Sequence, residues 1–195
     1  MTLSADSIHS TLRDLQERLV SSIVATLPAM LSGHEGEDLY AVAITTDSDV
    51  ITCSLLAHTE QCLAAIPELE EEPDYYRWFP DEWCLRDWEV DPPTGAESTA
   101  DVSRGLFDLK RSLTAEGTHL RDWKHAATDM LIGALGDESV RQVLGNVNAD
   151  WSPVLFVTET DGDSELALDS LEQLNGEHPH TSLLASAREF YGSQA

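Results

Sequence analysis

The sequence has few of the features that mark secreted, membrane or disulfide-stabilised proteins. Its three cysteines, Cys53, Cys62 and Cys84, form no CxxC pair, and this pattern predicts reduced, mostly buried thiols in a cytoplasmic protein. No apolar run approaches the roughly 20 residues that a membrane helix needs. Asp6 and Arg13 interrupt the region where a signal peptide would have its apolar core. We therefore expect a cytoplasmic protein that does not cross a membrane.

Basic residues are also scarce. The chain has 11 Lys and Arg against 36 Asp and Glu, which gives a formal net charge of −25 and a pI near 4.3. Such a surface repels nucleic acid and anionic membranes, and it attracts and steers a basic protein partner. Acidity that serves only solubility is the other interpretation, and the sequence leaves both open.

Catalytic and metal-binding motifs are missing as well: the chain has no GxGxxG, GxxxxGK[ST], HExxH or GxSxG. His119 and His125 are too far apart to share one helical face as ligands. His178 and His180 flank a proline, and the acidic turn at 158–165 lacks the spacing of an EF-hand. We predict no catalytic residue, no cofactor and no metal site. The missing motifs favour a protein that is not an enzyme, although they leave that question open.

What is present fits one globular domain over residues 1–195, with 42% hydrophobic residues. Apolar and turn-forming patterns predict an α/β (α+β) fold in which several helices cover a small, mostly antiparallel sheet. A hairpin over residues 39–57 seeds this sheet, and a third strand joins it. Strands are expected over 39–46, 50–57 and 153–159, and helices over 4–30, 61–66, 80–88, 97–116, 120–135, 138–144, 165–174 and 181–191.

The densest group of rings lies between Asp74 and Trp88, with three of the five tryptophans and two of the four tyrosines. One interpretation is that these rings belong to the core and that Arg77 pairs with Glu82. The other is a recognition surface beside the acidic run at 68–74, because Trp, Tyr and Arg carry most of the binding energy at protein interfaces. The candidate binding residues are Tyr75, Tyr76, Arg77, Trp78, Glu82 and Trp83.

Two short motifs resemble those of the bacterial domain-of-unknown-function family 4303. One is His58-Thr59-Glu60, at the end of the strand pair, and the other is Tyr76-Arg77-Trp78, followed by Glu82-Trp83. His58 stands where the family is expected to have asparagine. The resemblance implies a soluble bacterial protein without an established reaction, and some family members resemble immunity proteins that act against secreted toxins.

Three functional hypotheses follow. The first is a protein-binding module, such as an immunity protein that neutralises a basic toxin by charge complementarity. The second is a small-ligand binder or enzyme with a pocket lined by Tyr76, Arg77, Trp78 and Glu82, in which the guanidinium would hold an anion. The third is an assembly role through a homodimer.

Overall fold

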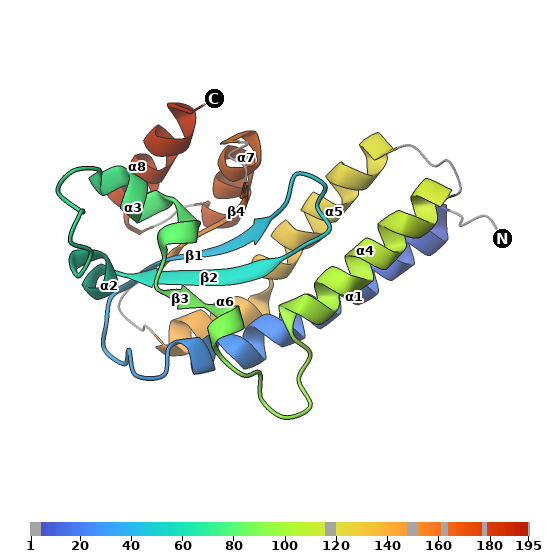
Figure 1. Ribbon diagram of the computed structural model, residues 1–195, viewed down its shortest axis with the longest axis horizontal. Coiled ribbons are helices and arrows are strands. Elements are labelled where there is room, and N and C mark those ends of the chain that lie inside the picture. The colour runs from blue at the N-terminus through green and yellow to red at the C-terminus, as the bar shows by residue number, and fades with distance from the viewer. Residues whose placement is uncertain (1–4, 116–119, 148–151, 161–163, 177–178, 195) are drawn as a thin grey trace.

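The computed structural model describes residues 5–115, 120–147, 152–160, 164–176 and 179–194. Within these residues, a four-stranded sheet separates two layers of helices (Figure 1). The strands follow the order β3-β2-β1-β4; β2 is antiparallel to β1 and β3, and β4 is parallel to β1. The predicted α+β class, with a small and mostly antiparallel sheet in a single domain, is confirmed. The strands are β1 (Leu39–Thr46), β2 (Ser54–Thr59), β3 (Leu85–Arg86) and β4 (Val154–Glu159).

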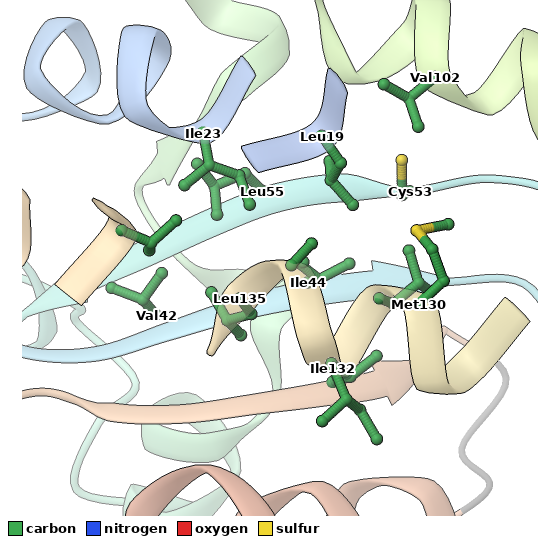
Figure 2. Packing of buried hydrophobic residues seen from close by; sticks show 14 of the residues in the cluster. Leu19, Ile23, Val42, Ile44, Cys53, Leu55, Val102, Met130, Ile132 and Leu135 are labelled. Carbon is green, nitrogen blue, oxygen red and sulfur yellow. The ribbon is translucent and has the colours of Figure 1, made fainter. Parts of the chain in front are cut away.

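One face of the sheet is covered by α1 (Ala5–Met30), α4 (Thr99–Ala115) and α5 (Leu120–Leu135), and α6 (Glu138–Val147) packs against α1. The apolar residues of α1 recur at helical spacing, so they form one buried stripe. Figure 2 shows side chains of this stripe meeting those of the sheet and of α5. The stripe consists of Leu12, Leu15, Leu19, Ile23 and Leu27.

The other face carries α2 (Glu60–Ala64), α3 (Pro73–Trp78), α7 (Ser164–Asn175) and α8 (Thr181–Gly192). A register shift between Leu39 and Ala41 interrupts the alternation of β1, and Tyr40 and Ala41 both join the core of this second face. The irregularity turns the phenol of Tyr40 toward the aromatic block.

The helix predicted over residues 80–88 is wrong. Phe79 is extended (φ −97°, ψ 102°), as expected of a residue that precedes proline. Pro80 opens only the short 3-10 turn η1 (Pro80–Glu82), after which come β3 and a second turn, η2 (Asp87–Glu89). The helix of this block is α3, which begins at Pro73, so the end of the acidic run at 68–74 is helical.

The second strand begins later than predicted because the segment before it bonds elsewhere. Val50 has φ +51°, a conformation that β-branched residues rarely adopt. The Cys53 N–H donates to Ser103 Oγ in α4 at 2.9 Å instead of to a strand. β2 therefore begins at Ser54 and extends to Thr59, which places His58 within the sheet.

The remaining elements lie close to their predicted positions, and α5 matches its predicted range. Pro28 lies within the last turn of α1. Among the helices of the described residues, none combines the length and apolar character required to traverse a bilayer.

Candidate functional site

Trp78 and Trp83 anchor the aromatic block, and neither exposes any surface. Their rings meet Phe156 of β4 edge-on at centroid distances of 6.5 and 5.7 Å. The Trp78 indole N–H donates to Ser186 Oγ of α8 at 2.9 Å, and the Trp83 indole N–H donates to the Arg77 carbonyl at 3.1 Å. Because their polar atoms are also paired inside the protein, these two predicted binding residues form part of the scaffold.

The carbonyl groups at the end of α3 are held by tyrosine hydroxyls from the core. Tyr40 donates to the Arg77 carbonyl at 2.9 Å, and Tyr191 donates to the Trp78 carbonyl at 2.6 Å. A helix end leaves such carbonyls without partners of its own. Side chains of β1 and α8 therefore fix the C-terminal end of α3, although the helix has only six residues.

Arg77 pairs with Glu60 and not with Glu82, so the predicted partner is wrong. Arg77 Nη1 and Nη2 donate to the two carboxylate oxygens of Glu60 at 2.6 and 2.9 Å. The guanidinium also lies over the Tyr40 ring, 4.7 Å from its centroid. The bidentate pair joins the His58-Thr59-Glu60 motif to the Tyr76-Arg77-Trp78 motif.

Besides Arg77, which is half-buried, the candidate residues that reach solvent are Tyr75, Tyr76 and Glu82, the tyrosines half-buried and the glutamate exposed. The Tyr75 hydroxyl donates to Glu82 Oε1 at 3.2 Å, and its ring stacks on Phe79 at 4.9 Å. Partial burial first, and then nearby carboxylates, raise the pKa of both phenols. We call this surface the acidic tyrosine face; it comprises Tyr75, Tyr76, Glu68, Glu71, Glu72 and Glu82.

A hollow beside the block is too small for an organic ligand. Phe79, Pro80 and Asp81 line it together with the ends of β1 and β4, and its volume is about 10 Å³. That is room for about one water molecule. The two outer nitrogens of Arg77 are already bonded to Glu60.

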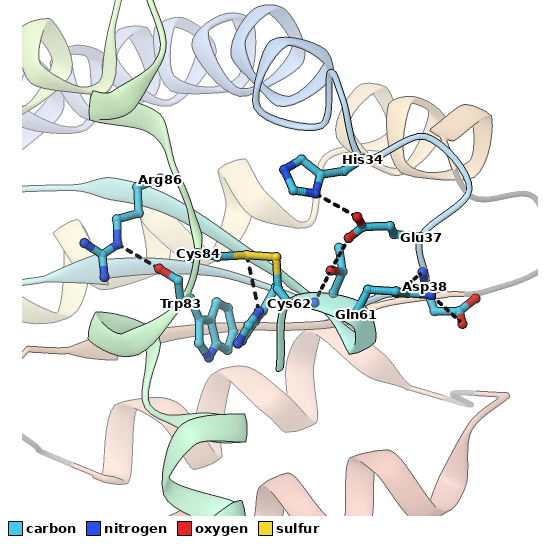
Figure 3. Close-up of a disulfide and its surroundings, with 10 residues drawn as sticks. His34, Glu37, Asp38, Gln61, Cys62, Trp83, Cys84 and Arg86 are labelled. Atoms are coloured by element: carbon cyan, nitrogen blue, oxygen red, sulfur yellow. Dashed lines mark hydrogen bonds and ion pairs between the residues drawn. A yellow bond between two sulfur atoms is a disulfide. The ribbon is translucent and has the colours of Figure 1, made fainter. Parts of the chain in front are cut away.

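The prediction of three reduced thiols is wrong, because Cys62 and Cys84 form a disulfide (Figure 3). The two residues are 22 positions apart, with Cα atoms 6.4 Å apart. Their proximity follows from the fold: Cys62 lies in α2, directly after the first motif, and Cys84 follows the second. Cys53 is a free, buried thiol, as predicted, and burial raises its pKa to about 12.

His58 is fully buried beside this disulfide. Its Nδ1 lies 3.6 Å from Cys84 Sγ, and its ring packs between Tyr40 and Trp83 at centroid distances of 5.5 and 5.7 Å. Burial, and then the charge of Arg77, lower the pKa of the imidazole to about 4. Within the described residues, Nε2 has no hydrogen-bond partner.

The loop between α1 and β1 brings two more ligand-type side chains to the same disulfide. His34 Nδ1 lies 3.1 Å from Glu37 Oε1, and Glu37 Oε2 accepts a hydrogen bond from Thr59 Oγ1 at 2.5 Å (Figure 3). This hydrogen bond is the first cause that lowers the pKa of Glu37. Thr59 Oγ1 also caps α2 by accepting from the Cys62 N–H at 3.1 Å.

The other histidines considered from the sequence do not join this group. His125 is exposed and lies 3.5 Å from Asp129. His119 and His178 lie outside the described residues, as does the centre of the acidic turn at 161–163. His180 immediately precedes α8.

Comparison with known proteins adds a family but no activity. No curated protein matches the chain, and no solved structure matches it. The family model described as "Domain of unknown function (DUF4303)" matches residues 19–176, which include both motifs and β1 to β4. The chain therefore belongs to the DUF4303 family.

Proposed function

We propose that this chain is a protein-binding module whose acidic tyrosine face receives a basic protein partner. The observation that carries the proposal is that tyrosine rings and glutamate carboxylates lie together on one ordered surface. Tyr75 and Tyr76 present half-exposed rings, and the carboxylates of Glu68, Glu71, Glu72 and Glu82 act on the Tyr76 phenol. Tyrosine supplies contact area at low entropic cost, and the carboxylates supply complementarity to Lys and Arg.

The scaffold beneath this face supports the proposal because it holds α3 before any partner arrives. The buried Trp78 and Trp83 and the Arg77–Glu60 pair anchor the C-terminal end of the helix. A surface that is already ordered loses less conformational entropy on binding than a flexible one. The net charge of −25 adds long-range attraction for a cationic partner.

The finer form of the proposal is an immunity protein that neutralises a basic toxin, as the family resemblance suggests. A pocket for a small anion at Arg77 has less support, because Glu60 already neutralises and occupies the guanidinium. An assembly role would use exposed apolar side chains such as Trp88, which is 58% exposed, but it would bring together two chains that each carry a net charge of −25.

A pull-down against the product of the neighbouring gene, at about 0.05 M and about 0.5 M salt, tests the proposal. We expect the wild-type chain to retain a basic protein at low salt and the Y75A/Y76A variant to retain much less. Y75F/Y76F is the matched control, because it keeps the rings and should retain most of the partner. Failure to retain the neighbouring product at either salt would contradict the proposal.

A further inference from the structure

Three elements that are separate in sequence bring two sulfurs and an imidazole together. His58 comes from β2, Cys62 from α2, and Cys84 from the residue before β3. The ligand atoms of these residues all lie within 4.8 Å of one another. Thiolate sulfur and imidazole nitrogen are the ligands of most zinc sites in proteins.

One of the two sulfur–nitrogen distances that the disulfide does not fix already fits a tetrahedral zinc site. Zinc binds thiolate at about 2.3 Å and imidazole at about 2.0 Å, so tetrahedral angles place sulfur and nitrogen about 3.5 Å apart. His58 Nδ1 and Cys84 Sγ are 3.6 Å apart. Opening the disulfide would let the two sulfurs separate to the similar spacing that two thiolates adopt around one ion.

The ring of His58 packs between Tyr40 and Trp83, but its two nitrogen atoms have little use as hydrogen-bonding groups among the described residues. The side chain is fully buried, and buried polar side chains usually have hydrogen-bond partners. Its contact with Cys84 Sγ is the polar contact shown for the ring, and Nε2 lacks a hydrogen-bond partner in the described part of the chain. Ligation through Nδ1 would give this nitrogen a strong partner.

Two further donor side chains lie beside Cys62. His34, Glu37 and Cys62 also place their ligand atoms within 4.8 Å of one another, and this trio shares Cys62 with the first. Glu37 is held by Thr59, and His34 contacts Glu37, so the loop before β1 is already positioned beside Cys62. The two trios share only Cys62, so this loop would have to move toward His58 and Cys84 for either side chain to complete a four-coordinate site.

We propose that, in the reduced protein, the thiolates of Cys62 and Cys84 and Nδ1 of His58 bind one Zn²⁺ ion, with Glu37 or His34 as the fourth ligand. The disulfide is the metal-free, oxidised form of this site. The proposal departs from the sequence-based prediction of a chain without a metal site.

A thiol reductant can open the Cys62–Cys84 disulfide in a balanced exchange reaction. A small dithiol transfers two electrons and two protons to the Cys62–Cys84 bond, which gives two thiols, and it becomes a disulfide itself. Zn²⁺ then replaces the two thiol protons, which pass to solvent. Cys84 is an exposed residue and Cys62 is half-buried, so the disulfide lies near the surface of the protein.

The test uses the full chain and the metal alone. The protein is reduced without oxygen by a small dithiol, freed from all reductant and titrated with Zn²⁺ and with Co²⁺ as a spectroscopic probe. We expect one ion per reduced chain, a thiolate-to-cobalt charge-transfer band, and the visible bands of tetrahedral Co²⁺. The oxidised wild-type chain should bind neither ion stoichiometrically, a comparison that needs no mutation.

Variants locate the ligands. C62S and C84S should lose stoichiometric binding, and H58A should weaken it by more than the roughly 10- to 100-fold cost of losing an outer-sphere partner. C53A should bind like the wild type, because Cys53 is buried beside Ser103 and outside the cluster. Absence of a stoichiometric ion in the reduced wild type, or unchanged binding in C62S and C84S, would overturn the proposal. The titration contains no protein partner, so its outcome is independent of the proposed binding function.

Discussion

Glu60, at the start of α2, and Arg77, near the end of α3, form a bidentate ion pair with nitrogen–oxygen distances of 2.6 and 2.9 Å. The pair ties together the His58-Thr59-Glu60 and Tyr76-Arg77-Trp78 motifs, both of which lie within the family match. Its side chains are 32% and 24% exposed, so solvent screens it only in part.

Removal of the Arg77 side chain should destabilise the protein. R77A leaves the Glu60 carboxylate without its partner and exposes the Tyr40 ring, so we expect the free energy of unfolding to fall by about 2 kcal/mol. Urea denaturation of R77A, E60Q and the double variant measures the coupling between the two side chains.

R111A is the matched control: the Arg111–Asp108 pair is 72% and 56% exposed, and its loss should cost less than about 0.5 kcal/mol. An R77A variant as stable as R111A would contradict a structural role for the pair.

The tryptophans and tyrosines of the block should respond differently to truncation. W78A and W83A each empty a fully buried site, and each should cost about 3–5 kcal/mol. Y75A and Y76A remove half-exposed rings, and each should cost about 1 kcal/mol. Thermal and urea unfolding of the four variants checks this division. Equal costs in the two groups would show that the tyrosines belong to the scaffold as well.

Reduction of the disulfide should destabilise the protein. Cys62 and Cys84 close a 22-residue separation that contains α3 and the acidic tyrosine face. Opening that loop should cost about 3 kcal/mol through the greater freedom of the unfolded chain. Urea unfolding with and without reductant, both with a chelator present, measures this difference. C62A/C84A is the control, and its stability should not respond to reductant; a wild-type chain equally indifferent would argue against the bond.

Asp87 should make stability depend on pH in a direction opposite to that of most carboxylates. It is buried, accepts from the Leu55 N–H at 3.0 Å and from the Thr99 hydroxyl, and burial raises its pKa. A raised folded-state pKa contributes stability at pH values below the unfolded pKa, near 3.9, and that contribution is lost as pH rises through the folded pKa.

The comparison of D87N with the wild type isolates this effect. D87N can keep both hydrogen bonds without burying a charge, so its stability relative to the wild type should improve as pH rises from about 4 to about 7. D87A leaves the Leu55 N–H unpaired and should cost about 1–3 kcal/mol. A D87N difference that falls over the same pH range would contradict the raised pKa.

Local patterns predicted most of the fold. The apolar spacing of the first helix and the β-branched run of β1 lead directly to α1 and β1, because each element buries one continuous set of side chains. Where tertiary contacts compete with local preference, the prediction failed. Ser103 of α4 takes the Cys53 N–H that a longer β2 would need, and Phe79 adopts the extended form that Pro80 favours.

The candidate site could be predicted only in part. The high density of aromatic residues marked the block in the sequence. Whether Arg77 pairs with Glu60 or with Glu82 depends on how the chain folds between residues 60 and 82. The disulfide joins cysteines that no short spacing relates, so the sequence favoured reduced thiols. The signal that could have revealed it was their position: each cysteine lies directly beside one of the two motifs.

Association kinetics with the product of the neighbouring gene test the central claim most directly. Reversal of two charges on the acidic tyrosine face, in E71K/E72K, should slow association at low salt by about 10-fold or more, and the difference should shrink as salt rises. E17K/E172K changes the net charge equally at exposed positions outside this face, and it should slow association far less. Equal slowing by the two double variants would show that only total charge matters, and would contradict a docking role for the acidic tyrosine face.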